Sequence, residues 1–180
     1  MKQFIWISSV LVATLIILTS WVTELNYVNL AQPVVAAPAS QESLTPEDRK
    51  AIEKIGIEFI SLNYTYTYED YVEAGLKVLP LLTKDFKDNY KTELEKSVIA
   101  ANAVKAKSSV ISSQIINVEK YEQNKGAIHL HFKAKVTNNG NESIAKYSTE
   151  LGLEKVGNEW SISNILSEEP VEFIELKNLL

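Results

Sequence analysis

The stretch AIHLHFKAKV, residues 127–136, decides the fold because apolar and polar side chains alternate along it. Successive side chains of a β-strand point to opposite faces of a sheet. One face of this strand is therefore apolar, and the other carries His129, His131 and two lysines. The pattern predicts a sheet with one face packed on a core and the other face in water.

Strand-like segments continue on both sides of this stretch, at residues 109–121, 144–156 and 159–166. Turn signals separate the last three strands: Asn138-Asn139-Gly140 is typical of a hairpin, and Gly157-Asn158 provides the next turn. A break in the alternation near Ser112-Ser113 indicates a bulge. Because the strands follow one another directly, we predict an antiparallel meander of about four long strands.

The preceding segment has a helical period instead. Ile52, Ile55, Phe59 and Leu62 recur at steps of three and four, which places them on one face of a helix. Helix starts are indicated by Thr45-Pro46-Glu47-Asp48, by Thr67-Tyr68-Glu69-Asp70 and by Thr83. We predict three helices, over about residues 45–66, 70–79 and 83–105, with Pro80 ending the second. The fold class is α+β.

A run of nineteen uncharged residues, 4–22, lies between Lys2 and Glu24. As a helix it would extend roughly 28 Å, about the hydrocarbon thickness of a bilayer. A signal peptide cleaved near Ala39 is the alternative, since Ala37-Pro38-Ala39 has the small-residue pattern of a cleavage site. That site follows the apolar run at a long distance, which favours an uncleaved transmembrane anchor.

The expected organisation follows from this anchor. Residues 1–3 are cytoplasmic, 4–22 cross the membrane once, 23–43 form a proline-containing flexible tether, 44–167 form the exported domain, and 168–180 form an apolar C-terminal tail. The expected location is the bacterial cytoplasmic membrane, with the N-terminus inside and the domain outside. Cleavage near Ala39 would instead give a secreted protein.

Composition excludes several classes of function. The 180-residue chain has no cysteine, so it has neither disulfides nor thiolate metal ligands. The formal net charge is -5 and the basic residues are mixed with acidic ones, which argues against nucleic acid as a partner. No phosphate-binding glycine loop, nucleophile elbow or metalloprotease pattern occurs. We predict no cofactor and no catalytic residue.

Two groups of residues are nevertheless candidates for chemistry. His129 and His131 project from one face of a strand, as a metal pair would, but Lys133 and Lys135 continue that face, so we predict no metal site. The other group is a tyrosine-rich run near a helix junction, with an apolar tail at the end of the chain. The candidate interface or pocket residues are Tyr64, Tyr66, Tyr68, Asp70, Tyr71, Phe173 and Leu176.

Three helices followed by long antiparallel strands, closing with the Asn158-Glu159-Trp160 turn, resemble the nuclear transport factor 2-like cone. Together with one preceding membrane helix, the layout is similar to bitopic inner-membrane assembly subunits of type IV secretion and conjugation systems, and to Mce-associated membrane proteins. This resemblance implies a scaffold and not an enzyme. Ketosteroid isomerase shares the general fold and uses a tyrosine with acidic groups, but none of its motif residues carries over to this chain.

The sequence therefore predicts a non-enzymatic, membrane-anchored interaction module of a bacterial envelope complex. Its expected partners are the membrane, through residues 4–22, and other envelope proteins, with self-association also possible. The alternative is a cone domain that binds a small apolar ligand or has weak enzymatic activity. An empty cavity lined by Tyr and Asp would favour the alternative, whereas filling by Phe59, Phe86 and Trp160 would favour the scaffold.

Overall fold

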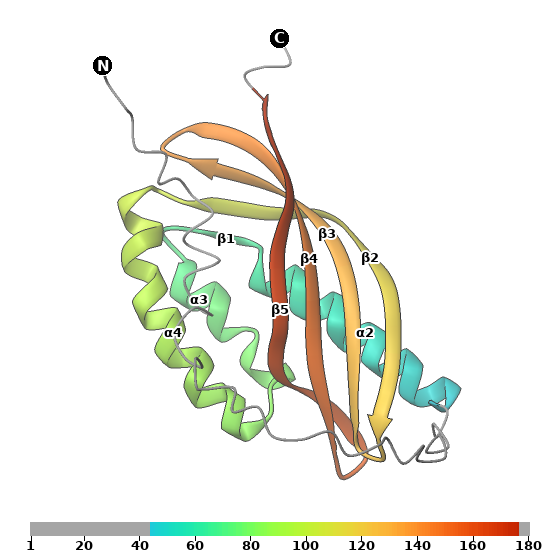
Figure 1. Ribbon diagram of the computed structural model, residues 1–180. Helices are drawn as coiled ribbons and strands as arrows, with labels where there is room; N and C mark the ends of the chain where they lie inside the picture. The colour runs from blue at the N-terminus through green and yellow to red at the C-terminus, as the bar shows by residue number, and fades with distance from the viewer. Residues whose placement is uncertain (1–43, 177–180) are drawn as a thin grey trace, which may run out of the picture.

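The computed structural model describes residues 44–176. Three α-helices come first: α2 (Pro46–Asn63), α3 (Tyr71–Leu76) and α4 (Lys84–Ala103), with a 3-10 turn at Leu79–Leu81 between the last two. Thr45 begins α2 as predicted, because its hydroxyl accepts a hydrogen bond from the Asp48 N–H at 3.1 Å. The predicted three helices are confirmed in this part of the chain (Figure 1).

A five-stranded antiparallel sheet accompanies the helices. Its strands are β1 (Tyr66–Thr67), β2 (Lys107–Glu122), β3 (Lys125–Asn138), β4 (Asn141–Val156) and β5 (Glu159–Glu175), paired in chain order. The four long strands form the predicted meander. The sequence did not predict β1, whose two residues pair with Lys107 and Ser108 at the start of β2.

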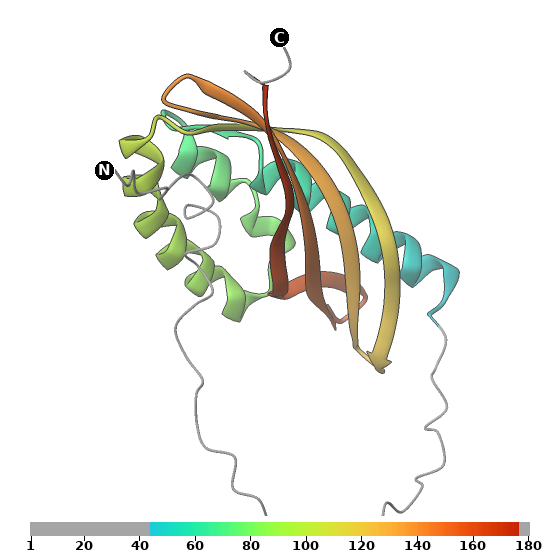
Figure 2. The same ribbon diagram turned by 45° about the horizontal axis from the view of Figure 1, so that its top comes forward.

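The sheet is strongly curved and encloses the helices on its concave side (Figures 1 and 2). Register shifts interrupt the β2–β3 pairing at three places and the β4–β5 pairing at three, whereas the β3–β4 pairing is continuous. Bulges bend a strand and increase its twist, so the outer strands carry the irregularities that let the sheet curl. One of them, between Val110 and Ser112, lies where the sequence indicated a bulge.

The core fills the concave side between sheet and helices. Phe59 and Ile60 of α2 pack with inward residues of β3 such as Ile128, Leu130 and Phe132, all of them buried. On the other face of β3, His131 and Lys133 are exposed. The alternation over 127–136 therefore has the predicted consequence.

Two boundaries differ from expectation. Helix α3 ends at Leu76 and the chain continues through a 3-10 turn that contains Pro80, so Pro80 does not end α3 directly. Strand β5 runs to Glu175, so the expected end of the domain at residue 167 lies inside a strand. Residues 168–175 pair with β4, and only the residues after them are left to form a tail. Pro170, which lacks an N–H, fits here because β5 is an edge strand.

None of the helices in residues 44–176 combines the length and the hydrophobicity that a membrane crossing requires. The expected anchor at residues 4–22 and the tether at 23–43 lie outside the described residues.

Candidate functional site

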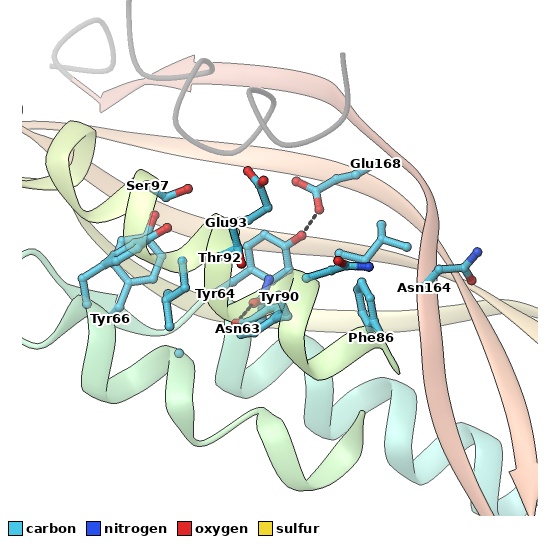
Figure 3. Close-up of a pocket in the computed structure, with 15 residues that line it drawn as sticks. Asn63, Tyr64, Tyr66, Phe86, Tyr90, Thr92, Glu93, Ser97, Asn164 and Glu168 are labelled. Atoms are coloured by element: carbon cyan, nitrogen blue, oxygen red, sulfur yellow. Dashed lines mark hydrogen bonds between the residues drawn. The ribbon is translucent and has the colours of Figure 1, made fainter. Parts of the chain in front are cut away.

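A cavity of about 370 Å³ lies between the helices and the edge strand β5 (Figure 3). Its wall is mostly aromatic and apolar, with a few amide, hydroxyl and carboxyl groups. The lining residues on which the site depends are Tyr64, Tyr66, Tyr71, Tyr90, Ser97 and Glu168.

Five different elements supply these side chains. Tyr64 caps the C-terminus of α2, Tyr66 lies in β1, Tyr71 is the first residue of α3, Tyr90 lies in α4 and Glu168 lies in β5. Strands β1 and β5 are the two opposite edges of the sheet. Because the sheet curls, residues of both edges line the same cavity.

A polar network runs along the cavity wall and ends at Glu168. The Tyr90 hydroxyl donates to Asn63 Oδ1 at 2.6 Å, and the Tyr64 hydroxyl donates to Glu168 Oε2 (Figure 3). The second carboxyl oxygen, Glu168 Oε1, is buried and has no hydrogen-bond partner among the described residues. An unsatisfied buried polar atom is unusual in a native protein and calls for an explanation.

Burial determines the ionisation of this network. It raises the pKa of Glu168 to about 7, and the hydrogen bond from Tyr64 opposes the rise only in part. Burial, reinforced by the negative charge of Glu168, also raises the pKa of Tyr64 well above its usual value and that of Tyr147 to about 12. The phenols therefore stay protonated at neutral pH, and the buried carboxyl group titrates near neutrality.

Contacts with two other aromatic rings fix the position of Tyr64. Its ring lies 4.4 Å, centroid to centroid, from that of Phe132 in β3, and Phe132 stacks on Tyr147 of β4 at 4.9 Å. All three residues are buried. The stacked rings of Phe132 and Tyr147 therefore support the ring of Tyr64, whose hydroxyl lies next to Glu168.

The structure divides the candidate residues chosen from the sequence. Tyr64, Tyr66 and Tyr71 meet at the cavity, whereas Tyr68 and Asp70 lie outside it, along a groove between α3 and α4. The other two candidates, Phe173 in β5 and Leu176 just after it, do not line the cavity.

Sequence reasoning missed Glu168 and Tyr90. Glu168 falls after the expected end of the last strand, in a Ser-Glu-Glu-Pro run that is typical of a loop. Tyr90 recurs at helical spacing with Phe86 and Leu94, which indicates an inward-facing position, and in the structure it lines the cavity. Glu168 pairs with the buried Thr149 of β4. This pairing places Glu168 at the site, but it can be recognised only when the register of β5 is known.

The aromatic residues whose presence inside the cavity would have favoured the scaffold do not fill it. Phe86 forms part of the wall, whereas Phe59 and Trp160 belong to the main core and do not line the cavity. The cavity is thus open and lined by tyrosines, with a glutamate instead of the expected aspartate. This is the arrangement that favours ligand binding over a fully packed cone.

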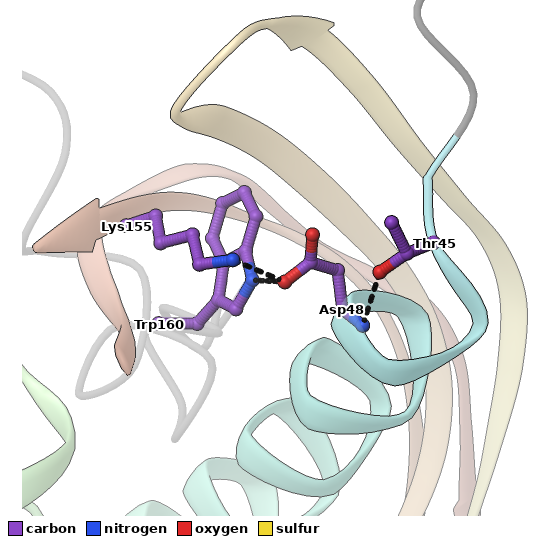
Figure 4. A network of polar contacts seen from close by, with 4 residues as sticks. All are labelled: Thr45, Asp48, Lys155 and Trp160. Carbon is purple, nitrogen blue, oxygen red and sulfur yellow. Dashed lines mark hydrogen bonds and ion pairs between the residues drawn. The ribbon is translucent and has the colours of Figure 1, made fainter. Parts of the chain in front are cut away.

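Trp160 instead belongs to a polar network at the N-terminus of α2 (Figure 4). Asp48 Oδ1 accepts hydrogen bonds from Trp160 Nε1 at 2.8 Å and from Lys155 Nζ at 2.7 Å. These two bonds, with that from Lys155 contributing most, lower the pKa of Asp48. The carboxylate of Asp48 therefore joins α2 to the β4–β5 hairpin.

The histidine pair lies on the outer face of the sheet. The two rings are 5.1 Å apart, and His129 Nε2 lies 2.7 Å from the Ser148 hydroxyl. In residues 44–176, no three His, Asp or Glu side chains are grouped closely enough to hold a metal ion.

A shallow groove lies on the outer side of α3 and α4, which we call the α3–α4 groove. Val72, Leu76 and Val98 form its apolar part, and Leu76 is 43% exposed. Carboxylates border it, and no basic side chain from the described part of the chain lines it. The remaining lining residues are Tyr68, Glu69, Asp70, Tyr71, Glu73 and Asn102.

Neither a family model nor a curated protein matches this chain by sequence. Solved structures match it by shape. An IcmL-like type IV secretion system protein from Legionella pneumophila superposes with a TM-score of 0.52 at 16% identity, covering 69% of this chain and 94% of that one. The periplasmic domain of DotI superposes with a TM-score of 0.53 at 13% identity, covering 72% of this chain and 99% of that one. A ketosteroid isomerase-like protein from Erwinia carotovora atroseptica superposes with a TM-score of 0.54 at 14% identity, covering 71% of this chain and 99% of that one.

These similarities establish the fold. Residues 44–176 form a nuclear transport factor 2-like cone of the kind found in type IV secretion and conjugation proteins. The resemblance inferred from element order is confirmed at this level. At such low sequence identities the same fold serves proteins of different function, so the role of this chain has to be argued from its own surfaces.

Proposed function

We propose that this protein is a non-enzymatic interaction module of a bacterial envelope complex. The observation that carries the proposal is the α3–α4 groove, in which Val72 and Leu76 are exposed next to one another on α3. Exposed apolar side chains bordered by polar ones are typical of protein contact sites. Because Glu69, Asp70 and Glu73 surround the groove, its partner presents apolar side chains flanked by Lys or Arg.

The polar network in the cavity supports the non-enzymatic part of the proposal. A tyrosine that stabilises negative charge on a substrate must have its O–H free to donate. The Tyr64 hydroxyl already donates to Glu168, and the Tyr90 hydroxyl already donates to Asn63. Because both hydroxyls already donate hydrogen bonds, neither Tyr64 nor Tyr90 is free to stabilise a developing oxyanion.

Changing Leu76 to Glu tests the groove. A carboxylate in the apolar part of an interface, among existing carboxylates, is expected to weaken partner binding at least tenfold through desolvation and repulsion. Stability should change little, because Leu76 is exposed. The measurement is recovery of the partner with the intact, affinity-tagged protein from its native membrane, quantified against wild type.

Ile111→Glu is the matched control, since Ile111 is 54% exposed and lies on β2, outside the groove. It introduces the same chemical change and should leave the complex intact. A Leu76→Glu protein that retains its partner as well as the Ile111→Glu protein does would contradict the proposal. If the recovered partner is a second copy of the chain, the module is a homo-oligomer.

We also propose that residues 4–22 anchor the protein in the cytoplasmic membrane, with the N-terminus inside and the domain outside. The support is the uncharged nineteen-residue run and the late position of the Ala37-Pro38-Ala39 site. The expected result is that the mature chain keeps its N-terminus and remains in the membrane fraction after a high-salt wash. Mass spectrometry of the mature protein checks this, and a chain beginning at Ser40 would contradict it.

Binding of a small ligand is a second candidate function, favoured by the open cavity. The two functions are compatible, because Tyr71 is the single described residue that lines both the groove and the cavity, whereas Gly75, Leu94 and Ser97 of the same helices line the cavity alone.

A further inference from the structure

The charged groups of the cavity are all of one sign. Among residues 44–176, Glu93 and Glu168 are the only ionisable side chains that line it apart from tyrosines, and no Lys, Arg or His of these residues lines it. Glu93 already pairs with Lys96 at 2.7 Å, on the more exposed side of α4. Glu168 has no cationic partner among residues 44–176. A cavity of this kind attracts a cation and repels an anion.

The unsatisfied oxygen of Glu168 indicates which group the cation must carry. Glu168 Oε2 accepts from Tyr64, whereas Oε1 is buried and accepts from no described group. An ionised carboxyl oxygen can only accept hydrogen bonds. The missing partner is therefore a donor, and a charged N–H donor forms the strongest such bond.

The aromatic wall indicates the chemistry of the rest of the ligand. Tyr64, Tyr66, Tyr71 and Tyr90 present ring surface to the cavity, and the faces of such rings attract organic cations while their area binds apolar groups. A compact volume of about 370 Å³ suits a single small molecule.

We propose that the cavity binds a small aromatic or alicyclic amine, whose ammonium group donates to Glu168 Oε1 and whose apolar body packs against the tyrosine rings. This inference rests on the second candidate function, the binding of a small ligand. It does not depend on the α3–α4 groove.

Three isosteric probes test it: tryptamine, tryptophol and indole-3-acetate, which share the indole ring and carry an ammonium, a hydroxyl and a carboxylate. Calorimetric titration of the full chain in mild detergent at pH 8, with empty micelles as the blank, measures the three affinities. Tryptamine is expected to bind at least tenfold more tightly than tryptophol, and indole-3-acetate is expected not to bind.

Two variants assign the effect to Glu168. Glu168→Gln should reduce the preference for tryptamine over tryptophol to about twofold or less. Glu169→Gln, which removes an adjacent exposed carboxylate, should leave the preference unchanged. Ser97→Leu, which adds bulk to the cavity wall without altering Glu168, should weaken all binding.

The outcomes separate the inference from the function on which it rests. Saturable binding of tryptophol or indole-3-acetate with an affinity equal to that of tryptamine would overturn the amine class and keep ligand binding. An unchanged preference in the Glu168→Gln protein would overturn the role of Glu168. Failure of all three probes to bind would overturn both the inference and the second candidate function.

Discussion

Replacing Glu168 by Gln is expected to raise the free energy of unfolding above pH 7 and to remove a pH dependence that the wild type shows between about pH 4.5 and 7. The folded-state pKa of about 7 exceeds the ordinary value of 4.5, so the native state holds more protons than the unfolded state in this window. Wild-type stability therefore falls as pH rises through the window and then levels off. The total loss is on the order of 3 kcal/mol.

The free energy of unfolding of the Gln variant at pH 8 is expected to exceed that of wild type by about 2 kcal/mol. This gain is smaller than the wild-type loss because the amide N–H of Gln takes the place of Oε1 and has no hydrogen-bond partner there either. The groups that face Glu168 are Tyr64 of α2, Tyr66 of β1, Tyr71 of α3 and Tyr147 of β4, all with raised pKa values, while Glu93 of α4 lines the same cavity. These tyrosines stay neutral throughout the window, so the slope reports Glu168.

Urea denaturation followed by circular dichroism, from pH 4.5 to 8, measures the effect. Glu169→Gln is the control, because that neighbouring carboxylate is exposed and should leave the wild-type slope in place. Wild-type and Glu168→Gln stabilities that run parallel across the window would show that the carboxyl group of Glu168 is not held in an unfavourable environment.

Phe132→Ala is expected to cause the largest loss of stability, about 3–5 kcal/mol. Phe132 is 2% exposed, and its ring packs against those of both Tyr64 and Tyr147. Its removal opens a void beneath Tyr64, so the hydroxyl that is held next to Glu168 loses its support. Chemical denaturation of the full chain gives the magnitude.

Phe173→Ala provides the comparison for this prediction. The residue type is the same, but Phe173 is 41% exposed on the edge strand, so its truncation should cost less than about 1 kcal/mol. If Phe132→Ala unfolds the protein completely, Phe132→Leu, with an expected loss of about 1 kcal/mol, still tests the packing role. Equal losses for Phe132→Ala and Phe173→Ala would contradict the proposed stack.

The sequence allowed the architecture to be predicted, because its signals are local and strong. Capping at Thr45, the helical spacing through Phe59 and the strict alternation over 127–136 each depend on neighbouring residues only. The candidate site was less predictable. Three of the tyrosines chosen from the sequence line the cavity. Their separation from Tyr68 and Asp70 depends on where α2 ends and α3 begins, within an interval of a few residues.

Glu168 shows why the remaining part of the site could not be found. Glu and Pro are depleted in strands, so Ser167-Glu168-Glu169-Pro170 predicts a loop by composition. The bulges in the β4–β5 pairing interrupt the alternation of inward and outward side chains along β5. Only the pairing of Thr149 with Glu168 therefore places this carboxyl group on the concave side of the sheet. Long-range register, and not local preference, determines this residue.

Pro170 also bears on how the molecule behaves at high concentration. An edge strand presents a row of N–H and C=O groups to which another chain can add, which is a route to fibrillar aggregation. In the outer part of β5, Pro170 removes one donor, the irregularity at Val171 disturbs the spacing, and Glu169 and Glu172 add like charges. The strand is thus a poor template for growth, which favours a dispersed protein at high concentration.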